Sequence, residues 1–225
     1  VQQAVFTEKS VGKQQLLDAL AANFDGFSDV RARLRACPKM GNNDDRADGL
    51  AARLMQLFAQ KVNGRPNGRG GIWRAGTGSA MEYIWKGEKC PATADGRLSG
   101  EPYSCSFSPS LDVKTDGLLS VIRSFTKFDL TQIINGGPLT IEIHDTVLRN
   151  DIGIEKTARL VQLFIRTGGH ELQINAVSRE VLRDAIEHPE NYASLIVRVS
   201  GFSAYYTTLC REVQEDILRR TEHAS

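Results

Sequence analysis

Apolar residues recur with a helical period over much of the chain. The pattern predicts helices at about 14–23, 29–35, 47–62, 116–128, 154–166 and 212–221, and a further helix capped by Ser178 that runs towards 188. The helix at 47–62 is amphipathic, with its large apolar residues on one helical period: Leu50, Leu54, Leu57, Phe58 and Val62. Gly168 and Gly169 end the helix at 154–166.

Three shorter stretches predict strands, at 139–144, 171–177 and 196–199. In the first, Leu139, Ile141 and Ile143 alternate with polar residues, as in a strand with two unlike faces. Strands that alternate with helices indicate an α/β architecture with parallel strands. We expect two parts, a helical and loop-rich segment over 1–110 and an α/β domain over 111–225.

Composition narrows the range of functions. The chain has 28 Lys and Arg against 27 Asp and Glu, so it lacks the basic field that favours nucleic acid or an anionic membrane. Its apolar runs are too short for a membrane span, and its N-terminus lacks the layout of a signal peptide. It also starts without Met, and we expect it to begin inside a longer product.

The cysteines predict neither a disulfide scaffold nor a zinc site. There are four, at 37, 90, 105 and 210, and no two form a CxxC pair. The four histidines also lack metal-ligand spacing. We therefore expect reduced thiols in a cytoplasmic protein without a metal.

Gly201 interrupts a β-branched and aromatic run near the C-terminus. A lone glycine in a strand usually marks a bulge or a close backbone approach. Two polar groups upstream have competing interpretations. His144 with Asp145 suggests acid–base chemistry or, more simply, the end of a strand. His170, Gln173 and Asn175 suggest either a polar site or hydrogen bonds that fix loops.

The run around Gly201 resembles the C-terminal signature of the glycyl radical enzymes. Six further blocks resemble this family in the family's order, at 38–45, 76–78, 95–102, 108–109, 168–175 and 188–192, and the end of the chain at 214–223 completes the set. The Ser203–Ala204 ending is more similar to the dehydratase and lyase members than to pyruvate formate-lyase.

The resemblance implies a fold and a cofactor. The fold would be the C-terminal half of a ten-stranded α/β barrel with a C-terminal glycyl radical domain. Gly201 would store a backbone radical, made by a separate activating enzyme that carries an iron–sulfur cluster and uses S-adenosylmethionine. A radical centre at Cα must flatten, and glycine has no Cβ to obstruct this.

Neighbours of Gly201 would support the radical loop: Arg198, Ser200, Phe202 and Ser203. Arg198 would anchor the preceding strand through a carboxylate or a carbonyl. Phe202 and Tyr205 would pack so as to keep water and oxygen away.

The resemblance also requires a cysteine thiol that this chain does not supply. In the family this cysteine lies far upstream of the glycine and is followed two positions later by Glu. Only Cys210 has that spacing, and its place after Gly201 suits the start of a helix instead. Cys105 lies in a loop that resembles one near the family's cavity, while Cys37 and Cys90 are ordinary buried or loop residues.

We therefore expect a glycyl radical lyase that is catalytically incomplete without its thiyl-cysteine part. It would cleave a C–O, C–N or C–C bond of a small polar substrate, as part of a homodimer in the cytoplasm or inside a bacterial microcompartment. The alternative is a radical-bearing rescue subunit that docks on an oxygen-cleaved enzyme. An α/β binding domain without radical chemistry is a third interpretation.

Overall fold

The computed structural model describes residues 1–111 and 113–224, which form two compact units. The first unit comprises Val1–Pro38 and Glu82–Tyr103, and the second comprises Lys39–Met81 and Ser104–Ser225. Each unit is thus built from two separate stretches of chain. These units are groups of residues in mutual contact, and they do not test the predicted division into domains at 1–110 and 111–225. That division stays a prediction.

The first unit is helical. It contains a short π-helix η1 (Gln2–Thr7) and the helices α1 (Lys13–Ala21), α2 (Ser28–Ala36) and α4 (Glu82–Glu88). Leu16, Val30 and Leu34 are buried in its core, and the second stretch contributes Ala92. The pattern predicted α1 and α2 but neither η1 nor α4.

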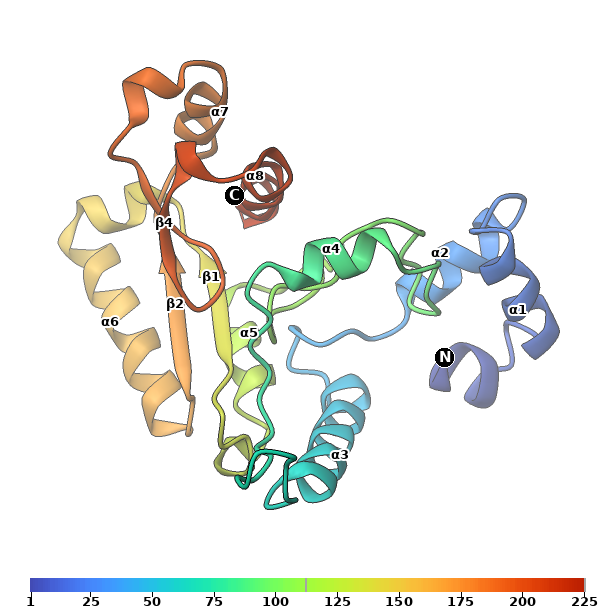
Figure 1. Ribbon diagram of the computed structural model, residues 1–225. Helices are drawn as coiled ribbons and strands as arrows, with labels where there is room; N and C mark the ends of the chain where they lie inside the picture. Colours follow the sequence, from blue (N-terminus) through green and yellow to red (C-terminus); the bar gives the residue numbers. More distant parts are fainter. Residues whose placement is uncertain (112, 225) are drawn as a thin grey trace. The chain divides into compact units, whose positions relative to one another are not determined.

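The second unit is mixed α/β (Figure 1). Its helices are α3 (Asp45–Val62), α5 (Leu118–Phe125), α6 (Asp151–Arg166), α7 (Arg179–Glu187) and α8 (Arg211–Ala224). Its strands are β1 (Pro138–Glu142), β2 (Glu171–Asn175), β3 (Ile196–Arg198) and β4 (Ser203–Tyr205). Short 3₁₀ helices join them: η2 (Leu130–Gln132), η3 (Asp145–Arg149), η4 (Pro189–Tyr192) and η5 (Tyr206–Thr208). Among the described residues, no helix combines the length and apolarity that a membrane span needs.

The strands pair in two ways. β1 and β2 are parallel, as predicted, and α6 connects them. β3 instead pairs antiparallel with β4, which the pattern did not predict. The expectation of parallel strands is therefore wrong for β3, because the chain reverses at Gly201 and returns along the same strand.

An apolar core lies on one side of the parallel pair. Leu139 and Ile141 of β1 belong to it together with Phe125 of α5 and Phe164 of α6, whose rings stack 5.7 Å apart. Leu172 and Ile174 of β2 pack against the same core. Because strand residues alternate between faces, the polar residues of both strands must lie on the opposite face.

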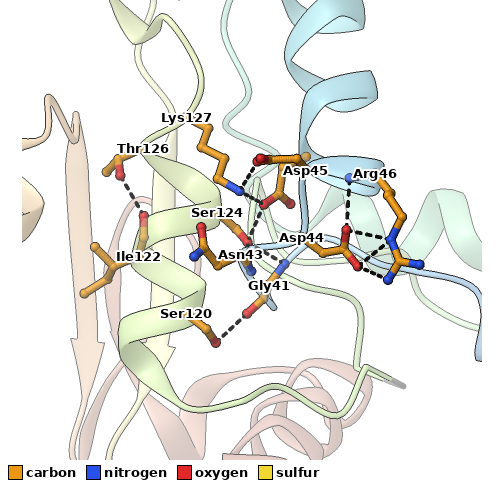
Figure 2. A network of polar contacts seen from close by, with 11 residues as sticks. Gly41, Asn43, Asp44, Asp45, Arg46, Ser120, Ile122, Ser124, Thr126 and Lys127 are labelled. Atoms are coloured by element: carbon orange, nitrogen blue, oxygen red, sulfur yellow. Dashed lines mark hydrogen bonds and ion pairs between the residues drawn. The ribbon is translucent and has the colours of Figure 1, made fainter.

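The loop before α3 is fixed to α5 by a polar network (Figure 2). The Ser124 hydroxyl accepts hydrogen bonds from the backbone N–H groups of Gly41 and Asn43, at 3.1 and 2.8 Å. It donates to the buried carboxylate of Asp48, 3.0 Å away. Lys127 pairs with both Asp48 and Asp45. This network holds the N-terminus of α3, where Asp44 is the N-cap.

Of the large apolar residues on the amphipathic period of α3, Val62 packs against the core. Ala59 is buried and Met55 packs against the core, whereas Leu54 and Leu57 are 58 and 50% exposed. Small alanine side chains on the packed face allow the helix to approach the core closely. The large leucines of the amphipathic pattern consequently lie on the outer face of this chain.

Candidate functional site

The second face of the parallel pair is polar and nevertheless buried. The register places Thr140 beside Gln173 and Glu142 beside Asn175. Each of these four residues is at most 9% exposed. A buried polar face needs hydrogen-bond partners, and the hairpin of β3 and β4 supplies them.

Two side-chain amides of β2 hold this hairpin. Asn175 accepts a hydrogen bond from the N–H of Arg198 at 2.7 Å and donates to the carbonyl of the same residue at 2.9 Å. Gln173 accepts a hydrogen bond from the N–H of Gly201 at 3.0 Å through its Oε1. The predicted role of Gln173 and Asn175 in fixing loops is confirmed, whereas His170, which was grouped with them, is exposed.

Gly201 occupies the turn of the hairpin in a conformation that favours glycine. Its φ is +85°, in the left-handed region that other residues rarely adopt. A Cβ built on Gly201 would meet no atom within 4 Å, and the residue is exposed. The backbone conformation, rather than crowding, is therefore what selects glycine structurally at this position.

A segment that runs beside β1 contacts the hairpin from another side. The Cys105 thiol lies 3.6 Å from the carbonyl of Val199, to which it donates, and 3.8 Å from the Thr140 hydroxyl. The hydroxyls of Ser106 and Ser200 are 2.7 Å apart. Ser106 has a φ of +49°, so a strained backbone presents the hydroxyl that meets Ser200.

Helix α8 contributes a buried cation. Arg220 donates to the carbonyl of Val199 at 3.3 Å, approaches Glu142 at 3.7 Å and pairs with Asp216 at 3.2 Å. All three charged side chains are at most 8% exposed. Burial raises the pKa of Glu142 above its ordinary value, while Arg220 and the hydrogen bond from Asn175 oppose that shift.

The residues predicted to support the loop lie within the hairpin itself. Arg198 donates to the Ser203 hydroxyl at 3.0 Å, and its guanidinium is 4.0 Å from the carboxylate of Glu171. Ser200 meets Ser106, as described above, and the carbonyl of Phe202 accepts the N–H of Val199 at 2.9 Å. These contacts place all four beside Gly201, and their supporting role stays a prediction.

The expected aromatic shield is not formed by this chain alone. Tyr205 is 51% exposed and Phe202 is only partly buried. Gly201 is exposed as well, so the described residues alone do not keep water from it, and the shielding role of Phe202 and Tyr205 stays a prediction.

The other candidate residues, Cys210 and His144, have structural roles. Cys210 is exposed directly before α8, and its carbonyl accepts the N–H of Val213, so it starts the helix as predicted. His144 accepts the N–H of Thr146 and caps η3, which confirms the simpler interpretation as a strand end. No cluster of potential metal ligands occurs in the described part of the chain.

Sequence reasoning missed three residues that hold the hairpin: Ser106, Glu142 and Arg220. The alternation of β1 already placed Glu142 in phase with Thr140, and that was the available signal. Arg220 lies in the block at 214–223, but neither it nor Ser106 showed a link to the hairpin, since their contacts with the hairpin span 94 and 21 residues of sequence.

A separate surface pocket of about 620 Å³ contains none of the predicted site residues. It lies in the second unit, and its lining includes Lys61, Arg65, Trp73 and Arg74. The hairpin site and this pocket are therefore distinct features of the unit.

Two family models match the chain. A model described as glycine radical covers residues 104–207, and one described as pyruvate formate lyase-like covers residues 1–87. The first includes the whole hairpin and both strands beneath it. The second lies upstream and includes α1, α2 and α3.

Two of the similar curated proteins carry the name of a dehydratase. The chain is 36% identical over 233 residues to the probable dehydratase YbiW of Escherichia coli K12, covering 99% of this chain and 29% of that protein. It is 34% identical over 220 residues to the trans-4-hydroxy-L-proline dehydratase of Clostridioides difficile, covering 97% and 28%. The chain thus spans less than a third of the length of these relatives.

Solved structures of similar proteins include another dehydratase. The glycerol-bound form of the B12-independent glycerol dehydratase from Clostridium butyricum is similar with a TM-score of 0.93 and 31% identity. The similarity covers 96% of this chain and 28% of that one. The arrangement of elements described here is therefore shared with the corresponding part of a dehydratase.

Proposed function

We propose that Gly201 stores a radical on its Cα. The premise is that this chain belongs to the glycyl radical enzyme family. The observation that carries the proposal is the place of Gly201. It lies at a hairpin turn with φ +85°, its N–H is held by Gln173, and the glycine radical model spans it.

The residues around Gly201 suit such a group. Delocalisation of an unpaired electron into both flanking amides requires a planar Cα, which the absence of a Cβ permits. The atoms before Gly201 are fixed, since Arg220 and Cys105 donate to the carbonyl of Val199 and Ser106 meets Ser200. Nothing lies within 4 Å of a Cβ position, so no neighbour crowds the Gly201 Cα.

The wider activity is that of a lyase of the dehydratase type. When formed, the radical supplies the unpaired electron that generates a thiyl group on a cysteine of the remaining part of the enzyme. That part would complete the ten-stranded barrel and carry most of the contacts to a small polar substrate, whose C–O, C–N or C–C bond is cleaved. The named dehydratase relatives support this choice.

The cysteines of this chain favour a separate thiyl-cysteine part. Cys105 is buried beneath the hairpin and donates to a backbone carbonyl, and Cys210 is exposed at a helix start. The activating enzyme, the homodimer and the cytoplasmic location expected from the resemblance belong to the same proposal. The alternative of a rescue subunit is less well supported, because residues 1–87 match the pyruvate formate lyase-like model as well.

Electron paramagnetic resonance tests the proposal. The chain would be incubated anaerobically with a radical S-adenosylmethionine activating enzyme, and we expect a doublet from the one hydrogen left on the Gly201 Cα. The Gly201→Ala variant is the control. Its added Cβ meets no neighbour, so only the backbone strain of a positive φ, about 1 kcal/mol, opposes folding.

Comparison of the wild type with Gly201→Ala decides whether the radical lies on Gly201. A doublet in the wild type and none in a folded Gly201→Ala chain assigns the radical to Gly201. A wild-type chain that folds, meets a competent activating enzyme and gives no doublet would contradict the proposal.

A further inference from the structure

The side-chain amide of Gln173 has one defined orientation. Its Nε2 donates to the carboxylate of Glu171 at 2.6 Å. Its Oε1 must then face the N–H of Gly201, which is a donor, at 3.0 Å. Gln173 is 2% exposed, so its amide is shielded from bulk water.

We propose that Gln173 stabilises the Gly201 radical electronically, in addition to fixing the turn. This inference rests on the proposed function of Gly201. When the activating enzyme accepts a hydrogen atom from Cα, one unpaired electron stays there. The lone pair of the Gly201 nitrogen then shares density with the half-filled orbital, and its N–H becomes more positive.

The hydrogen bond to Gln173 consequently strengthens when the radical forms. Positive charge on the donor strengthens a hydrogen bond, with a fully ionised partner as the upper limit. Glu171 reinforces the effect, because its carboxylate polarises the Gln173 amide and increases the negative charge on Oε1. An interaction that is stronger in the product than in the reactant shifts the equilibrium toward the product.

The hairpin offers a matched comparison. Asn175 is also a buried amide of β2 that holds the hairpin, but it bonds Arg198 rather than Gly201. Loss of either amide loosens the hairpin. Only loss of Gln173 alters the environment of the Gly201 nitrogen, so the two variants separate an electronic role from a structural one.

The experiment uses the full chain, activated anaerobically, with the radical observed by electron paramagnetic resonance. In Gln173→Met we expect a wider doublet than in the wild type, because more spin density stays on Cα. In Asn175→Leu we expect the wild-type splitting.

A second variant exchanges the two polar groups, Glu171→Gln with Gln173→Glu. It keeps the net charge and an acceptor at 173, and an ionised carboxylate is the stronger acceptor. We expect a splitting narrower than in the wild type. If Gln173→Met does not fold, the exchanged variant still tests the role of Gln173. An unchanged splitting in the exchanged variant overturns the inference.

The outcomes distinguish the two proposals. Absence of a doublet from the folded wild-type chain contradicts the radical on Gly201. A wild-type doublet whose splitting is the same in Gln173→Met, or changes equally in Asn175→Leu, leaves the radical in place and overturns the role of Gln173.

Discussion

Glu142 is a carboxylate that the fold removes from water on the polar face of β1. Its neighbours on that face are Arg220, Asp216 and Asn175, which come from α8 and β2. Burial has the largest effect on it and raises its pKa, although Arg220 opposes this. The folded chain therefore binds a proton at Glu142 more tightly than the unfolded chain does.

We predict that this residue makes stability fall with rising pH. Between the unfolded pKa, about 4.3, and the raised folded value, the native state binds more protons than the unfolded state. The free energy of unfolding then decreases as pH rises through that window. The Glu142→Gln variant, which cannot titrate, should have a flatter profile in urea denaturation as pH rises above about 4.

Exposed Glu190 provides the control for this measurement. Glu190→Gln should keep the wild-type dependence on pH. If Glu142→Gln and the wild type have parallel profiles, Glu142 is not the group that couples folding to protons.

At the scale of elements, polar residues decide how α3 joins the second unit. Asp48 is fully buried, yet it lies on the first turn of a helix whose large leucines are exposed. Ser124 of α5 and Lys127, which follows α5, bind the carboxylate of Asp48. The helix is therefore fixed at its N-terminus by charge and hydrogen bonds, and farther along by small apolar residues.

We predict that Asp48→Ala destabilises the chain by about 2–4 kcal/mol. Removal of one member of a buried pair leaves the other uncompensated, and Lys127 retains some exposure, which reduces the cost. Asp45 pairs with the same lysine but is 89% exposed, so Asp45→Ala should change stability little. Equal effects of the two variants in urea denaturation would refute the importance of burial here.

The elements also show what the sequence could predict. The helices at 154–166 and after Ser178 were predicted within about three residues, because their periodicity and caps are local signals. β4 was missed because Ser203–Tyr205 has no pattern of its own and exists only through pairing across Gly201. Its three residues are too few for periodicity to show.

At the scale of the whole molecule, the site combines residues from five stretches of the second unit. Gly201 and its polar neighbours could be recognised from sequence, since they form a local motif. The contacts of Ser106 and Arg220 depend on long-range packing and could not. The resemblance also implied a barrel. The described residues contribute one parallel pair of strands, and the rest of that architecture remains within the proposal.

The last prediction concerns oxygen, which reacts with a glycyl radical and breaks the chain at that residue. After confirmed activation and exposure to air, we expect mass spectrometry to show a chain that lacks Phe202 onwards. The released segment holds β4, η5 and α8, and it carries the buried side chains of Tyr206, Val213 and Ile217.

Burial of these side chains has a consequence for the cleaved molecule. The segment also keeps the contacts of Arg220 with Glu142 and with the carbonyl of Val199. We therefore expect both pieces to elute together under native conditions and to separate in urea. Gly201→Ala should stay intact in air, and an uncut wild-type chain after a recorded doublet would refute the assignment of the radical to Gly201.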